Sequence, residues 1–245
     1  MGKRINNLDL LSIYSTIKSI VIESGYSYEI KWQELININI VDKEYFAREA
    51  AWVILSSGMK ESIIRVLFKE ISIAFLNWST EDIAKNYDKC RKKALKIFNH
   101  RKKINAIIYI IKQINKHGFS QIRNSIIENS IDYISSLPYM GPATSYHFAK
   151  NLGMDVVKPD RHLLRISSFL GFDSPIALCQ VINNISGDKL SVVDLIFWRY
   201  ATINKDYLVF IKDHIKSINN RAISNYKENS DACLIQVDVP HYSSL

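Results

Sequence analysis

The sequence predicts an all-α protein whose helices form two lobes with a cleft between them. Apolar residues recur every three or four positions along most of the chain, which is the spacing of helices with one buried face. Residues that favour helix starts and helix ends separate these segments. With 245 residues, 47% of them hydrophobic, the chain can also bury a substantial core.

The chain is expected to form a single unit of two interleaved lobes. Approximately residues 45–150 should build one lobe of about six helices. The second lobe then combines approximately residues 1–44 with residues 151–225. The remaining residues, 226–245, are expected to be a polar tail, in which the short apolar run at residues 234–239 either packs as a strand or frays.

The N-terminal segment contains one clear helix and one ambiguous stretch. Residues 7–24 predict a helix that ends at Gly25, because glycine readily adopts the left-handed conformation that closes a helix. Residues 26–40 are ambiguous. Large apolar side chains alternate there, which fits either a short strand or an ordered loop, and these are Tyr28, Ile30 and Trp32.

A helix, a loop and a second helix follow. Asp42 is suited to cap a helix that runs to about Ser56, since its carboxylate can accept hydrogen bonds from free amides in the first turn. Ser57 and Gly58 then interrupt the helical pattern. Apolar residues between positions 64 and 75 predict the second helix.

A basic segment accounts for the net charge of the chain. The formal net charge is +8, and residues 85–103 contain nine Lys and Arg against one acidic residue, Asp88, so the charges of the remaining chain cancel. Such runs are most often solvated helix faces. This run leads into the first turn of a helix that ends at His117, where cations oppose the helix dipole. A bound anion would favour this placement.

The stretch around Gly141 predicts two helices joined by a tight hairpin. Pro138 disfavours helical geometry at the residue before it, so the preceding helix should end there. Gly141 can turn the chain at positive φ, and Pro142 suits the first position of a helix that runs to about Asn151, before Gly153. The free amides and the dipole at the start of this helix make a seat for a phosphate group.

Asp160 occupies the start of the next helix, after an extended segment at residues 155–159. A carboxylate in this position is stabilised by the helix dipole and should be ionised at neutral pH. On position alone, the simpler interpretation is that Asp160 serves only as an N-cap.

The C-terminal third predicts three further helices. Ser174 precedes the first of these, which Gly187 ends. The spacing of Ser191 and Asp194 matches a variant of the capping box, in which side chains bond the free amides of a first turn. A last helix is expected over residues 206–223.

Two sequence patterns together resemble a known family. The pattern L-P-x-x-G-x-x-T spans Leu137–Thr144, and the pattern P-D-x-H-x-x-R spans Pro159–Arg165. Both resemble the helix-hairpin-helix DNA glycosylase superfamily, which includes endonuclease III, the adenine glycosylases and the alkylpurine glycosylases. The resemblance is specific over Leu137–Arg165 and extends weakly from Phe46 to Ala201. It implies a central DNA-binding cleft.

The resemblance implies roles for several groups of residues. The Asp of the second pattern is catalytic in the family and matches Asp160. The hairpin and the basic segment are expected to hold the DNA backbone through Met140, Gly141, Ala143, Thr144, Lys92, Lys93, Arg101 and Lys102. The base pocket, or the wedge that fills the space left by a flipped base, is expected to involve Met59, Tyr139, Tyr146, His147, Trp52 and His162.

Two positions depart from the family pattern. In the family, the first loop across the cleft carries the wedge, often a Gln, but Gly58 offers no side chain here, so Met59 is the candidate. Tyr139 stands where a second hairpin glycine is common, and it either narrows the phosphate seat, points into the pocket or packs on the hairpin. We expect His162 to make structural hydrogen bonds and Arg165 to anchor its helix.

The expected activity is hydrolytic removal of a damaged or modified base from DNA, which leaves an abasic site. Family members that also cut the strand use a Lys at the position of Ala143, and Lys150 lies too far along the helix to replace it. We therefore expect a monofunctional glycosylase, in base excision repair or in defence against phage DNA with modified bases. Small residues at Gly58 and Ala143 leave room for a bulky base. The alternatives are a non-catalytic helix-hairpin-helix protein that only binds DNA and a helical scaffold with a lysine-rich surface.

No cofactor is expected, with a monovalent cation at the hairpin as the one alternative. Cys90, Cys179 and Cys233 lie far apart, unlike the clustered cysteines of iron–sulfur members of the family. The histidines show no zinc-binding spacing. No run is apolar enough to span a membrane and no signal peptide is apparent, so we expect a monomeric cytoplasmic protein that acts on DNA in the nucleoid.

Overall fold

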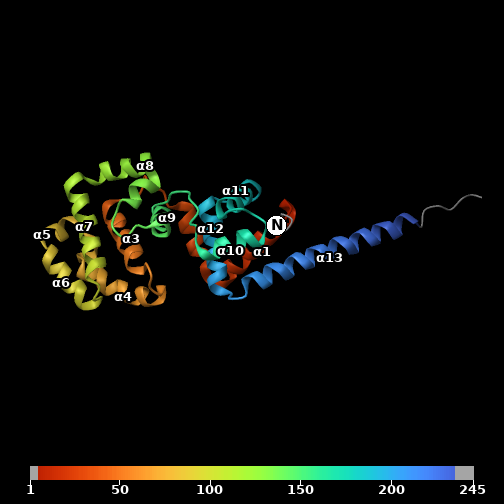
Figure 1. The fold of residues 1–245 in the computed structure, drawn as a ribbon, viewed down its shortest axis with the longest axis horizontal. Helices are drawn as coiled ribbons and strands as arrows, with labels where there is room; N and C mark the ends of the chain where they lie inside the picture. Colours follow the sequence, from red (N-terminus) through yellow and green to blue (C-terminus); the bar gives the residue numbers. More distant parts are fainter. Residues whose placement is uncertain (1–4, 235–245) are drawn as a thin grey trace, which may run out of the picture.

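The structure is a computed structural model that describes residues 5–234, with side-chain surroundings for residues 5–220. The described chain is helical and contains no strand, which confirms the predicted fold class (Figure 1). None of the described helices is long and apolar enough to cross a membrane. The helices, in chain order, are α1 (Asn7–Val21), α2 (Ser27–Leu35), α3 (Lys43–Ser56), α4 (Glu61–Ala74), α5 (Thr80–Lys85), α6 (Tyr87–Ile97), α7 (Arg101–His117), α8 (Phe119–Ser135), α9 (Pro142–Asn151), α10 (Arg161–Phe169), α11 (Pro175–Ser186), α12 (Leu190–Ile203) and α13 (Tyr207–Leu234). A π-helical turn, Ile22–Tyr26, links α1 to α2, and a 3-10 turn, Leu76–Trp78, precedes α5.

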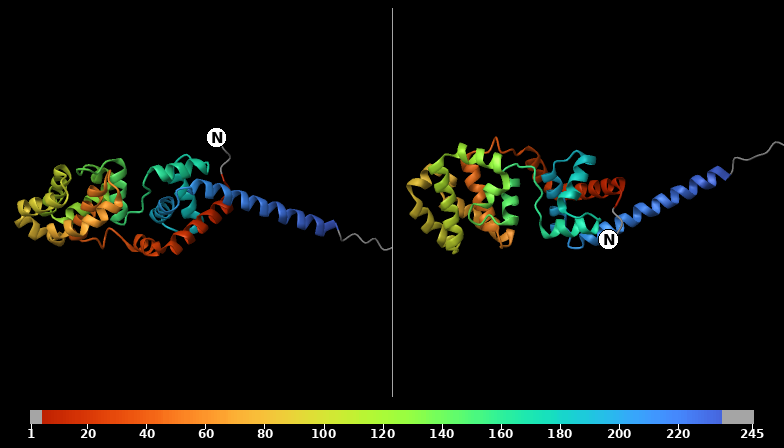
Figure 2. Two further views of the ribbon diagram at one scale, coloured as in Figure 1. Left: turned by 90° about the horizontal axis from the view of Figure 1, so that it is seen from below. Right: turned by 45° about the horizontal axis from the view of Figure 1, so that its top comes forward.

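The helices form two lobes, each around its own hydrophobic core. The first core takes side chains from α3 to α9, among them Phe46, Ile107 and Phe148. The second core takes side chains from α1, α2 and α10 to α13, among them Leu10 and Phe197. The two lobes lie end to end along the long axis of the molecule, and α13 leads away from the second lobe (Figures 1 and 2).

The chain crosses between the lobes twice, and the two crossings meet at one point. The first crossing lies between α2 and α3, and the second lies between α9 and α10 (Figure 2). Ile36 and Val41, in the first crossing, already pack in the first core, ahead of the predicted boundary near residue 45. Gly153, in the second crossing, lies against Asn37, because an added Cβ atom would be 2.5 Å from the backbone N and Cα of Asn37.

Residues 26–40 contain a helix, α2, rather than a strand or an ordered loop. Gly25 has a φ of 89° and kinks the chain, after which the helical course resumes. Ile30 and Gln33, about one turn apart, are buried, whereas Tyr28 is 57% exposed. In a strand, Tyr28, Ile30 and Trp32 would share one face. In the helix only Ile30 of these three is buried, so their alternation did not indicate a strand.

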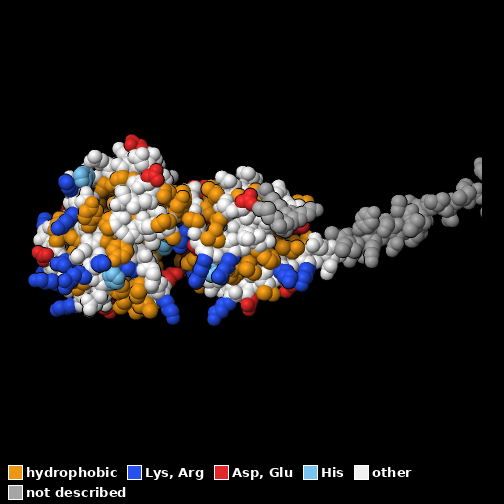
Figure 3. Space-filling view, viewed as in Figure 1, with side chains coloured by type: hydrophobic (Ala, Val, Ile, Leu, Met, Phe, Trp, Pro, Cys, Tyr) orange, Lys and Arg blue, Asp and Glu red, His pale blue; other side chains and the backbone are white. Residues whose placement is uncertain are grey.

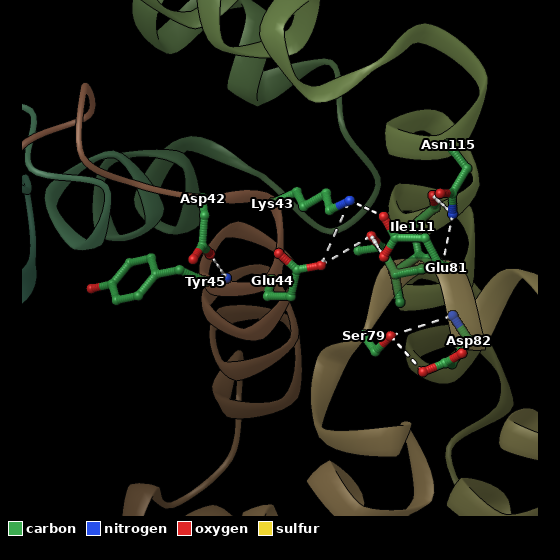
Figure 4. Close-up of polar contacts among 10 residues, drawn as sticks. Asp42, Lys43, Glu44, Tyr45, Ser79, Glu81, Asp82, Ile111 and Asn115 are labelled. Atoms are coloured by element: carbon green, nitrogen blue, oxygen red, sulfur yellow. Dashed lines mark hydrogen bonds and ion pairs between the residues drawn. The ribbon is translucent and has the colours of Figure 1, made fainter.

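Asp42 caps α3 as the sequence predicts. Its carboxylate accepts a backbone hydrogen bond of 2.7 Å within the first turn of the helix. Beside it, Lys43 forms an ion pair with Glu81 in the first turn of α5 (Figure 4). Asn115 of α7 donates to a backbone carbonyl of the same turn of α5 at 3.1 Å. These contacts hold α3, α5 and α7 together at one end of the first lobe.

The basic segment is divided between three helices. Asn86, with a φ of −134°, separates α5 from α6. Lys103, at the start of α7, is only 4% exposed. Its Nζ donates to the carbonyls of Leu55 (2.8 Å) and Ser57 (2.5 Å) at the C-terminal end of α3. Lys103 therefore satisfies the free carbonyls of another helix and is not available to an external anion.

The C-terminal third agrees with the prediction in α11 and differs in the next two helices. Ser174 caps α11, and Gly187 follows it in the left-handed conformation. Asp194 is not a capping residue, because it is buried in the interior of α12, and the Ser191 amide in the first turn instead donates to the carboxylate of Asp155 at 2.8 Å. The last helix, α13, continues to Leu234, so the first part of the predicted tail is helical. The rest of the apolar run at residues 234–239 lies outside the described residues.

Gly153→Ala should lower the stability of the protein more than Gly187→Ala. The two glycines have similar φ values of 83° and 79°, but an added methyl group meets neighbouring atoms only at Gly153. We expect Gly187→Ala to cost about 1 kcal/mol because of the left-handed backbone. Gly153→Ala should cost about 2 kcal/mol more, because the methyl group would overlap the Asn37 backbone. Thermal unfolding followed by circular dichroism measures both variants, and equal melting temperatures would show that the crossings do not touch there.

Candidate active site

The hairpin between α8 and α9 is turned by Tyr139 rather than by Gly141. Tyr139 has a φ of 66°, whereas Gly141 has a φ of −70° and a ψ of −178°. Gly141 is instead the extended N-cap before Pro142, the first residue of α9. A left-handed tyrosine costs roughly 1–2 kcal/mol. Packing of its ring on the first core and against His100, with ring centroids 6.2 Å apart, offsets this cost.

The start of α9 offers free backbone amides at the protein surface. The amides of Gly141, Ala143 and Thr144 make no hydrogen bond within the described part of the chain. Met140 differs from them, because its amide donates to the carbonyl of Leu137 at 3.1 Å and its side chain is buried. The Met140 amide is therefore not free to bind a phosphate, contrary to the prediction for this residue. The other three amides remain suited to an anion.

Two exposed cations directly follow His100, the residue that contacts this hairpin. His100 contacts the hairpin tyrosine, Lys103 is bonded to the end of α3, and Arg101 and Lys102 lie between them with exposed side chains. The other cations predicted to bind DNA, Lys92 and Lys93, are exposed on α6. Helix α6 lies at the end of the first lobe remote from the second, where Lys and Arg side chains gather (Figures 1 and 3).

A cavity of about 800 Å³ lies between the two lobes. Its wall is formed by residues of α2, α3, α4, α9 and α12, by the loop between α3 and α4, and by Lys158 in the second crossing. The space-filling view shows the hollow between the lobes (Figure 3). Ala143 and Thr144, at the start of α9, are part of this wall. The free amides of the hairpin therefore lie at the edge of the cavity.

Three of the residues predicted for the base pocket or the wedge line the cavity. Trp52 is half-buried on α3, with its ring edge-on to Phe68 at 5.1 Å between centroids. Met59, between α3 and α4, is 39% exposed, as a wedge residue must be. His147 lines the wall from α9.

The other three predicted residues lie outside the cavity wall. Tyr139 packs on the first core, and Tyr146 is half-buried on α9 without reaching the wall. His162 lies beside Tyr207, with its Nδ1 3.4 Å from the hydroxyl. Arg165 is exposed and makes no hydrogen bond or ion pair with the described residues, so it does not anchor α10, which is held by its apolar face.

Asp160 is the N-cap of α10 and lies close to the cavity. Its Oδ1 accepts hydrogen bonds from the amides of His162 (2.8 Å) and Leu163 (3.0 Å). Both capping bonds use Oδ1, so the cap leaves Oδ2 available. Asp160 itself is not part of the wall, but Lys158, two residues earlier, is. Asp160 therefore lies within two residues of the cavity wall, and its catalytic role stays a prediction.

A buried network that the sequence analysis missed joins the two lobes beside Asp160. Asp194 of α12 is 1% exposed and forms an ion pair with Lys150 of α9. The same carboxylate accepts a hydrogen bond from the backbone amide of Lys158. Burial raises the pKa of Asp194, and the ammonium of Lys150 opposes this effect. Burial lowers the pKa of Lys158, and the charge of Asp160 opposes that effect.

A sequence signal for this network was present. Asp194 interrupts an otherwise apolar run at residues 192–197, and a carboxylate is rarely buried there unless it is paired. Its spacing from Ser191 suggested a cap instead. The partner could not be identified from the sequence, since Lys150 is separated from Asp194 by 44 positions.

The cysteines and the acidic residues give no sign of a metal site in the part of the chain that the structure describes. No group of three or more His, Cys, Asp or Glu is placed to hold a metal ion there. Cys90 and Cys179 are buried free thiols. The side chain of Cys233 lies outside the described surroundings.

The two lobes, the hairpin with its free amides and the capped aspartate beside the cavity define a helix-hairpin-helix architecture. Among solved structures, the chain is similar to an 8-oxoguanine glycosylase/lyase from Methanocaldococcus jannaschii, crystallised in complex with a 15-mer DNA containing 8-oxoguanine. The TM-score is 0.55 and the identity 20%, over 77% of this chain and 97% of that one. The likeness confirms the two-lobed, all-helical fold that the sequence resemblance implied. No family model matches the chain, and no curated protein matches it in sequence.

The stability of the folded protein should fall in acid partly because of His147. Burial, together with the charges of Lys158 and Lys150, lowers the pKa of His147 to about 3. In the unfolded chain a histidine takes up a proton below a pH of about 6.5. Above about pH 6.5, His147 is neutral in both the folded and the unfolded state and does not change the free energy of unfolding. As the pH falls from 6.5 towards 3, only the unfolded state takes up the proton, so the free energy of unfolding decreases.

Between pH 6.5 and 5, this difference should lower the free energy of unfolding by about 2 kcal/mol. Urea unfolding of the parent and of His147→Gln, over a pH range from about 7.5 to about 5, measures it. The variant should show the flatter dependence on pH. His117→Gln, which changes an exposed histidine, serves as the control and should follow the parent. Parallel curves for the parent and His147→Gln would contradict a neutral His147 imidazole in the folded protein.

Proposed function

We propose that the protein is a DNA N-glycosylase that removes a damaged or modified base by hydrolysis and leaves an abasic site. The observation that carries this proposal is the position of Asp160, which caps α10 two residues after Lys158 of the cavity wall, while the start of α9, with its free amides, borders the same cavity. The similar structure, a glycosylase/lyase bound to DNA that contains a damaged base, supports it. The activity would serve base excision, in repair or in defence against phage DNA with modified bases.

In the proposed reaction, a nucleotide flips out of the duplex into the cavity, at a cost of a few kcal/mol. The amides of Gly141, Ala143 and Thr144 bind a backbone phosphate, and Arg101 and Lys102 add charge next to it. As the base leaves, positive charge develops on the sugar ring. The free oxygen of Asp160 stabilises this charge and orients the attacking water.

The proposal includes no lyase step and no cofactor. A strand-cutting step would need an amine at the sugar, and Ala143 provides none at the position used in the resembled family. We propose that the protein acts as a monomer on DNA in the cytoplasm. The monovalent cation at the hairpin stays a prediction from the sequence.

A non-catalytic DNA-binding protein is the second candidate. Asp160 makes two capping hydrogen bonds at the start of α10. This structural role alone would explain an aspartate at this position, without a catalytic role. The free amides and the exposed cations would then serve binding alone. The two candidates differ in what the negative charge of Asp160 does.

Asp160→Asn should slow base release while leaving folding and DNA binding intact. Asparagine caps helices about as well as aspartate, so α10 keeps its first turn. Loss of the negative charge should slow release by roughly 10²- to 10⁴-fold. The measurement is single-turnover formation of alkali-labile sites in oligonucleotides that carry different damaged and modified bases. Asp42→Asn, at the cap of α3, is the matched control, since Asp42 does not line the cavity. Release by Asp160→Asn at the parental rate would favour the DNA-binding candidate.

The parent protein should form no covalent adduct with DNA under borohydride. Borohydride traps only a Schiff base, which requires an amine nucleophile. Lys158 is the amine to test, because it lines the cavity and burial lowers its pKa. Gel electrophoresis of the parent and of Lys158→Gln after borohydride treatment decides the point. An adduct that forms with the parent and disappears in Lys158→Gln would replace hydrolysis by a lyase mechanism at Lys158.

A further inference from the structure

The cavity is large for a single nucleobase. Its volume of about 800 Å³ lies towards the upper end of the roughly 300–1,000 Å³ that holds whole drug-sized ligands. The wall extends from Ala143 at the hairpin to Tyr28 on α2 and Lys69 on α4. A nucleotide held at the hairpin would therefore leave the part of the cavity bounded by α2 and α4 unfilled.

Aromatic rings supply the apolar part of the wall and come from four helices. They are Trp32 of α2, Trp52 of α3, Phe68 of α4 and Trp198 of α12. All four are half-buried, so part of each ring remains exposed to the cavity or to solvent. A flipped base has two faces and can stack on two rings at most. Arg199 covers one face of Trp198, and Trp52 and Phe68 pack edge-on against each other, so the ring surface left for a second group is the exposed part of these half-buried rings.

The charged groups of the wall are mostly paired with one another. Arg199 of α12 binds Glu29 of α2 through two hydrogen bonds of 2.8 Å and 2.5 Å. Arg48 and Glu49, both on α3, form an ion pair with 2.8 Å between a guanidinium nitrogen and Oε1. Two further pairs of wall residues join Arg65 to Glu61 and Lys150 to Asp194. Such pairs present donors and acceptors to a ligand without net charge. Two wall cations, Lys69 and Lys158, lie outside these pairs; Lys69 is exposed, and Lys158 lies in the second crossing, which follows α9, and not on α2 or α12.

Two of these pairs also contact further residues that fix their position. The Arg199 guanidinium lies over the rings of Tyr26, at 4.3 Å from its centroid, and Trp198, at 4.6 Å. Glu49 accepts a hydrogen bond of 2.9 Å from Asn151. Their polar atoms are therefore fixed before a ligand arrives, which reduces the entropy lost on binding. Hydroxyl groups, which both donate and accept, match paired ions of this kind better than an anion does.

We propose that the cavity takes a nucleobase that carries a bulky, uncharged, polyhydroxylated substituent of about the size of a hexose. The base lies at the hairpin side of the cavity, and the substituent lies against α2 and α12, beside the Glu29–Arg199 pair and Trp198. This inference rests on the proposed glycosylase function and specifies its substrate. A small base would leave the part of the cavity beside the Glu29–Arg199 pair filled with water, and that part would add no binding energy.

The test compares release of four bases from otherwise identical duplexes. These are 5-hydroxymethylcytosine, its glucosylated form, uracil and 8-oxoguanine. We expect release of the glucosylated base to exceed that of 5-hydroxymethylcytosine by roughly tenfold or more. Release of the small bases at equal or higher rates would overturn the inference and leave the proposed function standing. Absence of release from all four would overturn the inference and count against the proposed function as well.

Tyr28→Ala probes the far end of the cavity. The Tyr28 side chain is exposed, and its hydroxyl donates to Glu29 at 3.2 Å, so its removal leaves both cores intact. The ratio of glucosylated-base release to small-base release should fall roughly fivefold. Leu35→Ala, at a 76% exposed position of the same helix outside the wall, should leave this ratio unchanged. An unchanged ratio in Tyr28→Ala would overturn the placement of the substituent.

Discussion

The geometry of the site depends on the buried ion pair between Lys150 and Asp194. It joins α9, whose first turn carries the free amides, to α12 in the other lobe. The same carboxylate holds the backbone amide of Lys158, which lies just before Asp160. One buried anion thus fixes the hairpin, the second crossing and the cavity wall relative to one another. Removal of one partner from such a pair typically costs about 3–5 kcal/mol, because the remaining charge stays buried and unpaired.

In the proposed function, binding of the DNA backbone and recognition of a base use different kinds of charge. Cations beside the hairpin, Arg101 and Lys102, are exposed, and with the free amides they suit a phosphate at the surface. Inside the cavity, by contrast, each acidic wall residue has a basic partner, as in the pair of Glu29 and Arg199. Surface charge attracts any nucleic acid, whereas the paired wall selects by shape and hydrogen bonding.

The sequence predicted those features that depend on neighbours within one turn. Asp42, Ser174 and Pro142 start helices where expected, because a cap or a fixed φ acts locally. Features that depend on distant partners were missed. Asp194 resembled a capping residue because its partner lies on another helix, and Lys103 resembled one more surface cation because the carbonyls that it binds belong to α3. Within the site, three of the six predicted pocket residues, Trp52, Met59 and His147, line the cavity, and the roles of these residues and of Asp160 stay predictions.

The interleaved course of the chain has a consequence for its synthesis. The first core is continuous in sequence, from Ile36 to Leu152, so it can form while the C-terminal third is still on the ribosome. Helix α1 is made first, yet Leu10 and Ile13 on its apolar face pack with residues of α11 and α12, which are made near the end. A truncated chain that stops before α10 would therefore keep a complete first lobe and expose this face, and such fragments would be prone to aggregate.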